Sequence, residues 1–147
     1  MNIKKLSILL ADDDTDDCHF FAEALETLPI STQLKTVHDG DELMNYLIEN
    51  KQYLPHVLFL DINMPRKNGF ECLAEIKQDE KLKDLPVIMF STSSEREKIN
   101  ILFKTGADVY IRKPGNFAQL VQVIQHALPI AAENIFSNGK LKYILNA

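Results

Sequence analysis

The sequence predicts an α/β fold with a doubly wound five-stranded parallel sheet. Five short apolar runs alternate with segments of helical periodicity, a pattern typical of parallel sheets covered by helices on both faces. Most of these runs are continuously apolar, as strands buried on both faces are. Because crossovers between parallel strands are right-handed, the topology reduces to a doubly wound sheet.

The strands are expected where the apolar runs lie. They are LSILLA (6–11), QLKTV (33–37), HVLFLD (56–61), PVIMFS (86–91) and VYIRK (109–113).

Helices are expected in the intervening segments, because apolar residues recur there three or four positions apart. Pro29 is expected to end the first helix. The apolar positions, helix by helix, are Phe21, Leu25 and Leu28; Leu43, Met44, Leu47 and Ile48; Leu73 and Ile76; Ile99, Leu102 and Phe103; and Leu120, Val123, Ile124 and Ala127.

The composition indicates one ordinary globular domain. The chain has 147 residues, of which 46% are hydrophobic, and a net charge of −5, which argues against nucleic acid and anionic membranes as partners. Cys18 and Cys72 form no CxxC pair and favour free thiols in a reducing compartment. The apolar run 8–11 is too short for a signal peptide, and no segment approaches the ~20 apolar residues of a membrane span. These features predict a cytoplasmic protein.

The polar residues that could carry chemistry follow the predicted strands. Asp12 and Asp13 end the first strand, Asp61 the third, Ser91 the fourth and Lys113 the fifth. In an open parallel sheet a site lies beyond the carboxyl ends of the strands, where the strand order reverses. All five residues are therefore expected at one edge of the sheet.

Five of the six residues 12–17 are aspartates, and this crowding has several interpretations. Asp14, Asp16 and Asp17, with Thr15, stand where a helix N-terminus favours acceptors and negative charge. Helix capping does not explain Asp12 and Asp13, because they lie at the end of the strand, before the helix begins.

Two further interpretations of the aspartates match only in part. In a calcium loop of the EF-hand type, Asp12, Asp14, Asp16 and Glu23 would be ligands, but Asp17 stands where that loop needs glycine. A phosphohydrolase of the haloacid-dehalogenase type carries DxDx[TV] after its first strand, but here the last position is Asp16.

A fourth interpretation, a magnesium and phosphoryl site shared with Asp61, follows from a resemblance. The motifs are DD (12–13), FLDINMPRKNG (59–69), PVIMFS with Ser91, and GADVYIRKP (106–114). Over roughly residues 5–128 the chain resembles a response-regulator receiver domain of two-component signalling. The fold implied is the flavodoxin-like receiver fold, (βα)5. The segment RKNGFECLAEIKQDEKLKDLP is also similar to the single-domain, phytochrome-associated regulators.

The resemblance implies a role for each aspartate. Asp61 would attack the phosphohistidine of a partner sensor histidine kinase and carry the phosphoryl group. Asp13 and Asp61 would bind Mg²⁺ directly with the backbone carbonyl of Asn63, and Asp12 largely through water. Counted formally, Asp12, Asp13 and Asp61 would be balanced by Mg²⁺ and Lys113.

The resemblance also implies roles on the switch side. Lys113 would pair with a phosphoryl oxygen, Ser91 would donate a hydrogen bond to it, and Tyr110 would turn inward as the loop moves. The alternatives are a solvated lysine, a strand-ending serine and a half-buried strand tyrosine. Pro114 suggests a cis peptide bond that aims the lysine, the alternative being a trans loop proline.

The function expected is that of a stand-alone receiver that assists only its own phosphorylation and dephosphorylation. The alternative is a metal-dependent phosphohydrolase of the haloacid-dehalogenase type. The four histidines show no metal-ligand spacing and are expected to be structural; they are His19, His38, His56 and His126.

Residues 129–147 are expected to be an extension of the domain that spans 1–128. Pro129 is expected to start a fresh helical turn. Asn138–Gly139 is a turn signal, and Leu141 and Tyr143 alternate with lysines. The extension is too apolar to be solvated. It either folds back onto its own domain or packs on a second copy, which would make a homodimer.

Overall fold

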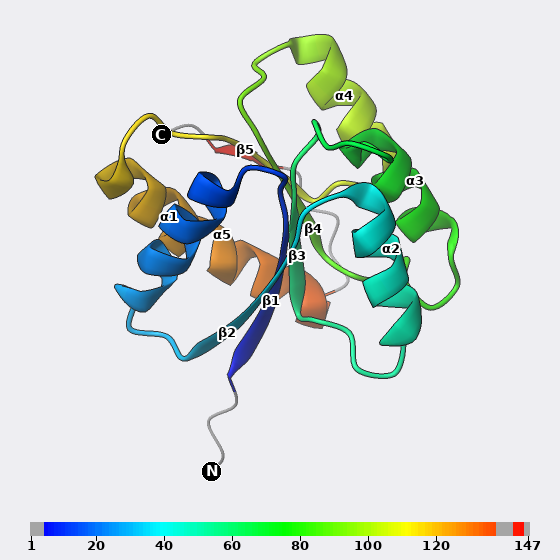
Figure 1. Cartoon of the computed structure of the whole chain (residues 1–147), viewed down its shortest axis with the longest axis horizontal. Helices are drawn as coiled ribbons and strands as arrows, with labels where there is room; N and C mark the ends of the chain where they lie inside the picture. The colour runs from blue at the N-terminus through cyan, green and yellow to red at the C-terminus, as the bar shows by residue number, and fades with distance from the viewer. Residues whose placement is uncertain (1–4, 138–142, 146–147) are drawn as a thin grey trace.

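A computed structural model of the chain describes residues 5–137 and 143–145, and it contains one parallel sheet of six strands. The order across the sheet is β2-β1-β3-β4-β5-β6 (Figure 1). The five predicted strands and the doubly wound parallel sheet are confirmed, and a sixth short strand adds to the β5 edge. The strands are β1 (Leu6–Ala11), β2 (Thr32–Val37), β3 (Val57–Leu60), β4 (Val87–Ser91), β5 (Val109–Arg112) and β6 (Tyr143–Leu145).

Five helices cover the two faces of this sheet. In Figure 1, α1 and α5 lie on one side, and α2, α3 and α4 lie on the other. Their bounds are α1 (Thr15–Glu26), α2 (Gly40–Glu49), α3 (Gly69–Gln78), α4 (Arg96–Thr105) and α5 (Phe117–Ser137).

The continuous apolar runs are explained by two separate cores. Successive strand residues point to opposite faces. In β1, Leu9 packs in the core under α2, α3 and α4, whereas its neighbour Leu10 packs in the core under α1 and α5. β3 does the same with Leu58 and Phe59. Every strand position must therefore be apolar, which hides the alternation that a one-sided sheet would show.

The helix boundaries follow local chemistry. Asp14 caps α1, and its side chain accepts from the backbone of Asp16 and Asp17. α1 ends at Glu26, three residues before Pro29. Asn68 caps α3 in a capping box: its side chain accepts from the backbone N–H of Glu71, and the Glu71 side chain accepts from the backbone N–H of Asn68. Asn68–Gly69 therefore begins the helix.

Two details of the predicted helices differ from the structure. Ile48 is 54% exposed, so the buried stripe of α2 is narrower than its spacing suggests. Pro129 lies inside α5 and does not start a new helix. Because a proline lacks the N–H, α5 forgoes one hydrogen bond there and yet continues to Ser137.

The extension contributes a strand to its own sheet. Residues 143–145 pair in parallel with β5, with Tyr110 opposite Ile144. α5 runs through residue 128, where the sequence suggested a division, and the domain boundaries stay a prediction. Asn138–Gly139 and Leu141 lie outside the described residues. Within the described residues, no helix is long and apolar enough to cross a membrane.

The topology fixes where a site belongs. β1 lies between β2 and β3, so the strand order reverses at its carboxyl end. Asp12 and Asp13 follow β1, and Asp61 follows β3, on either side of that crevice.

Candidate functional site

Backbone hydrogen bonds hold the residues that follow the strands. The N–H of Asp12 donates to Val37 O at 3.0 Å, which extends the β1–β2 pairing by one residue. Asp61 N–H donates to Ala11 O at 3.0 Å, and Lys113 N–H donates to Ser91 O at 2.8 Å. The side chains therefore project from a rigid frame.

Three carboxylates meet at the crevice. Asp12, Asp13 and Asp61 each offer an oxygen, and these oxygens lie within 4.8 Å of one another. Asp12 is fully buried and Asp61 is 5% exposed, whereas Asp13 reaches solvent. Carboxylate oxygens are the donors that a hard divalent cation takes, and Mg²⁺ in particular needs only one or two of them beside its waters. The donor set fits such an ion.

Lys113 donates to three carboxylates at once. Its Nζ lies 2.8 Å from Asp12 Oδ2, 2.9 Å from Asp17 Oδ2 and 3.3 Å from Asp61 Oδ2. An ammonium group has three N–H donors, so this arrangement uses all of them. The solvated-lysine alternative is not what the structure shows, because the side chain is only 11% exposed.

The environment shifts the ionisation of this pair. Burial raises the pKa of Asp61 to about 6, against the opposing attraction of Lys113. Burial also acts to lower the pKa of Lys113, but its hydrogen bond to Asp12 and the charges of Asp61 and Asp12 outweigh it and raise that pKa. An ionised Asp61 is thus costly without a cation beside it and is favoured when one binds.

Asp17 is the site residue that the sequence interpretation missed. It does lie in the first turn of α1, where negative charge is expected, but Asp14 is the cap, and the Asp17 carboxylate also contacts Lys113. The expected formal charge balance, three carboxylates against Mg²⁺ and Lys113, therefore needs a correction, because it leaves out Asp17. With Asp17, four carboxylates face one ammonium, and a divalent cation would still leave one negative charge in excess. No local spacing reveals this contact, because the two residues lie 96 positions apart.

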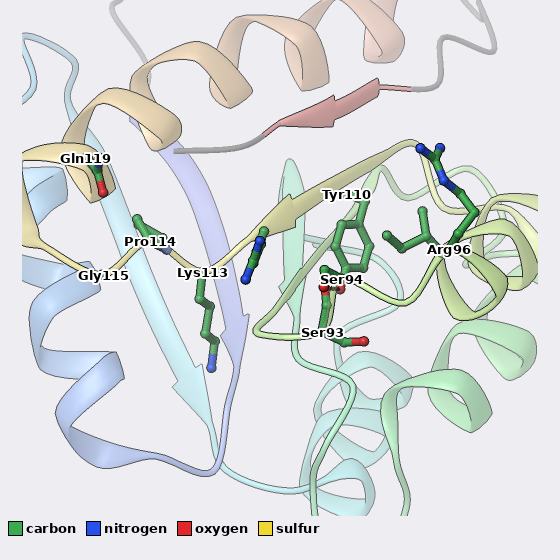
Figure 2. A pocket seen from close by; sticks show the side chains of 10 residues that line it. Ser93, Ser94, Arg96, Tyr110, Lys113, Pro114, Gly115 and Gln119 are labelled. Carbon is green, nitrogen blue, oxygen red and sulfur yellow. Dashed lines mark hydrogen bonds between the residues drawn. The ribbon is translucent and has the colours of Figure 1, made fainter.

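Ser91 and Tyr110 lie on the other side of Lys113. Ser91 is fully buried, and its Oγ has no hydrogen-bond partner among the described residues. Tyr110 is 1% exposed, and its hydroxyl donates to Ser93 O in the loop after β4. Figure 2 shows Tyr110 beside Ser93 and Ser94, with Lys113 projecting from the end of β5. The half-buried alternative for the tyrosine is not what the structure shows.

A cavity of about 540 Å³ opens between these elements (Figure 2). Its lining contains no aspartate, but it includes Lys113, which contacts Asp12, Asp17 and Asp61. Pro114 also lines it, and the expected cis bond before this proline is a correction: every described peptide bond is trans. The backbone hydrogen bond from Lys113 N–H to Ser91 O already fixes the position of Lys113 at the end of β5.

The loop after β3 is tightly packed. The N–H of Gly69 donates to Ile62 O at 2.7 Å, and a Cβ on Gly69 would lie 2.3 Å from Asp61 O. The backbone of Asn63, which is exposed, donates to the Asp61 carboxylate. Only a residue without a side chain fits this approach behind Asp61.

The structure also bears on the calcium-loop alternative and on the histidines. Among the described residues, the acidic group that could hold an ion comprises Asp12, Asp13 and Asp61, which is not the calcium-loop set. Two histidines make structural contacts: His38 Nδ1 lies 3.1 Å from Asp12 O, and His56 Nδ1 accepts from Ser7 N–H.

Comparisons with known proteins agree with this geometry. Residues 8–125 match the family model described as the response regulator receiver domain. Response regulator Rcp1 of Synechocystis is 33% identical over 122 residues, which cover 80% of this chain and 83% of Rcp1.

Two solved structures are similar over most of their length. One is the phosphorylated cyanobacterial phytochrome response regulator RcpA, with 34% identity and a TM-score of 0.78, covering 94% of this chain and 99% of RcpA. The other is the Mn²⁺-bound form of Rcp1, with 30% identity and a TM-score of 0.72, covering 88% and 92%.

Proposed function

The chain belongs to the response regulator receiver domain family, and from this premise we propose that Asp61 accepts a phosphoryl group from a sensor histidine kinase with Mg²⁺ as cofactor. It is a receiver domain homologous to single-domain response regulators. One observation carries the proposal: the nearly buried carboxylate of Asp61 lies between two further aspartates and the ammonium of Lys113.

A divalent metal belongs in the acidic pocket of a receiver domain, and Mg²⁺ is our proposal for this one. Asp13 and Asp61 would hold it with the backbone carbonyl of Asn63. Asp12 would act through water, because its two carboxylate oxygens already accept from Asp14 N–H and Lys113. The bound cation supplies positive charge that lets an anionic phosphoryl group approach a carboxylate.

The transfer itself is a substitution at phosphorus. An Asp61 oxygen forms the new O–P bond while the P–N bond to the kinase histidine breaks, and its electron pair returns to the imidazole nitrogen. Lys113 would then donate to a phosphoryl oxygen.

Ser91 would connect this event to the switch. Its buried Oγ lies at the end of β4 and has no hydrogen-bond partner in the part of the chain that the structure describes, so a phosphoryl oxygen could satisfy it. Drawing Ser91 inward would move the loop that carries Ser93, which Tyr110 holds through its hydroxyl. We propose this path from Asp61 to Tyr110 as the output of the switch.

The proposal extends to partners and location. RcpA is described as a phytochrome response regulator, so phytochrome-type kinases are the first candidates to test. The receiver would assist only its own phosphorylation and dephosphorylation, without binding nucleic acid or membrane. A cytoplasmic location agrees with two buried free cysteines. The phosphohydrolase alternative is not supported by any of these relatives.

A homodimer through the extension also remains our proposal. Deleting residues 138–147 would then lower the mass measured in solution for the phosphorylated chain. An unchanged mass would leave β6 as a strand of its own sheet and nothing more.

Phosphorylation by a small donor tests the main proposal. We expect acetyl phosphate with Mg²⁺ to add one labile phosphoryl group, seen by intact mass, and EDTA to prevent it. The matched control is Asp61→Asn, which should gain none. Many turnovers of a generic phosphate ester, without a stable phosphoprotein, would indicate a hydrolase instead.

A further inference from the structure

Asp17 contacts the site from α1, and none of the roles above uses it. Its Oδ2 lies 2.9 Å from Lys113 Nζ, closer than the 3.3 Å that separates this ammonium from Asp61 Oδ2. The carboxylate is 37% exposed, whereas its lysine partner is 11% exposed. The ion pair is therefore partly buried on its lysine side, and it lies beside the contacts of Lys113 with Asp12 and Asp61.

We propose that Asp17 is a positioning residue of the phosphoryl-transfer site, which draws the Lys113 ammonium toward α1 and competes with the phosphoryl group for it. This inference rests on the function proposed above. It assigns Asp17 an effect that acts through Lys113 and not through contact with the phosphoryl group.

The donor count of Lys113 gives the first consequence. Two of its three N–H groups go to Asp12 and Asp17, which leaves one for Asp61. Without Asp17 the ammonium would depend on Asp12 and Asp61 alone and would lie closer to Asp61. It would then compete with a divalent cation for the same carboxylate, so the affinity for Mg²⁺ should fall.

The charge count gives the second consequence. With the cation bound, the pocket carries one excess negative charge, and Asp17 supplies it. An anionic phosphodonor is repelled by that charge. Removing it should speed phosphorylation once Mg²⁺ is saturating, and it should leave the ammonium freer to bind the phosphoryl group.

The chain offers a matched control in Asp16. Both residues lie in the first turn of α1, where negative charge favours the helix, and both backbone N–H groups donate to Asp14. Asp17 alone reaches Lys113. Comparing Asp17→Asn with Asp16→Asn therefore separates the contact with Lys113 from the effect of a charge at the helix N-terminus.

Calorimetric titration of the metal-free protein with Mg²⁺ is the first measurement. We expect Asp17→Asn to weaken Mg²⁺ binding on the order of fivefold, because the ammonium that Asp17 holds would then compete with the cation for Asp61. Asp16→Asn should change it less than about twofold, and Asp17→Glu, which keeps the charge, should stay near the parent. In a Lys113→Ala background, Asp17→Asn should have a clearly smaller effect, because the route through the ammonium is gone.

The rate of phosphorylation by acetyl phosphate at saturating Mg²⁺ is the second measurement. Asp17→Asn should raise it on the order of fivefold, and Asp16→Asn should not. Equal effects of the two variants, a slower rate for Asp17→Asn, or an undiminished Mg²⁺ effect without Lys113 would each overturn the inference. If the unmutated protein is never phosphorylated, the proposed function fails. The Mg²⁺ affinities of the single and double variants of Asp17 and Lys113 would still decide whether Asp17 acts through Lys113.

Discussion

Asp61 is the residue at which stability and function oppose each other. It is buried beside two other carboxylates, and its pKa is raised to about 6. A carboxyl group whose pKa is higher in the folded state than in the unfolded chain costs stability: the cost begins above the unfolded pKa of 3.8 and is complete above the folded pKa of about 6. The cost is offset only when a cation enters, which couples metal binding to folding.

Asp61→Asn should therefore stabilise the metal-free protein at pH 7.5, by about 1–3 kcal/mol. The gain should fade as the pH falls below 6 and vanish below 3.8, where the carboxyl is protonated in both states. Chemical denaturation in EDTA across this pH range measures it. A clear loss of stability at pH 7.5 would contradict the electrostatic account of the pocket.

Lys113→Ala should have the opposite effect on stability. It leaves the fully buried Asp12 without its cation, which typically costs about 3–5 kcal/mol for a buried pair. Affinity for Mg²⁺ should hold or rise, because the competing ammonium is gone. Chemical denaturation measures the loss of stability, and calorimetry measures the affinity for Mg²⁺. A large fall in that affinity would contradict this account and would mean that Lys113 holds the metal ligands in place.

At the scale of elements, the site depends on how closely the loop after β3 approaches α3. The first residue of α3, Gly69, lies against the backbone of Asp61 and Ile62. That contact is with backbone atoms, which cannot rotate aside as a flexible side chain would. The packing of the first residue of α3 against this backbone thus fixes the position of Asp61 relative to the sheet.

Gly69→Ala should destabilise the protein by about 1–3 kcal/mol, as overpacking does, and should also weaken Mg²⁺ binding. Gly115→Ala is the matched control for stability, because a Cβ there would meet nothing within 4 Å. Thermal unfolding compares the two. Equal stability for both variants would show that the loop accommodates a methyl group freely.

The sequence predicted the elements best where a pattern is local. The five runs match the strands to within one residue at each end, because most runs are bounded by polar residues and the run 86–91 begins at a proline. The edge of the sheet at which Asp12, Asp61, Ser91 and Lys113 meet followed from topology alone. The contact of Asp17 could not be predicted, since it depends on how α1 is rotated against the end of β5.

At the scale of the whole molecule, β6 protects an edge. It pairs with β5, the strand that carries Tyr110 and leads to Lys113. An uncovered edge strand presents unpaired backbone groups. The alternation around Tyr143 hinted at a strand, but the sequence could not say which edge it would join, because sheet order is not a local property.

Deleting residues 138–147 should lower thermal stability, because the β5 edge loses its partner, while phosphorylation by a small donor should persist. Every proposed site residue lies between Asp12 and Lys113, outside the deleted segment. Melting curves and intact mass measure the two effects. Loss of phosphorylation in a truncated protein that still unfolds cooperatively would place β6 within the working site.

The central claim, that Asp61 carries the phosphoryl group, is tested most directly by mapping the modified residue. Borohydride reduces an acyl phosphate of aspartate to homoserine, which peptide mass spectrometry locates. After treatment with a phosphodonor we expect homoserine at position 61, dependent on Mg²⁺ and absent without donor. Homoserine at Asp12, Asp13 or Asp17, or none in a protein that demonstrably binds Mg²⁺, would contradict the account.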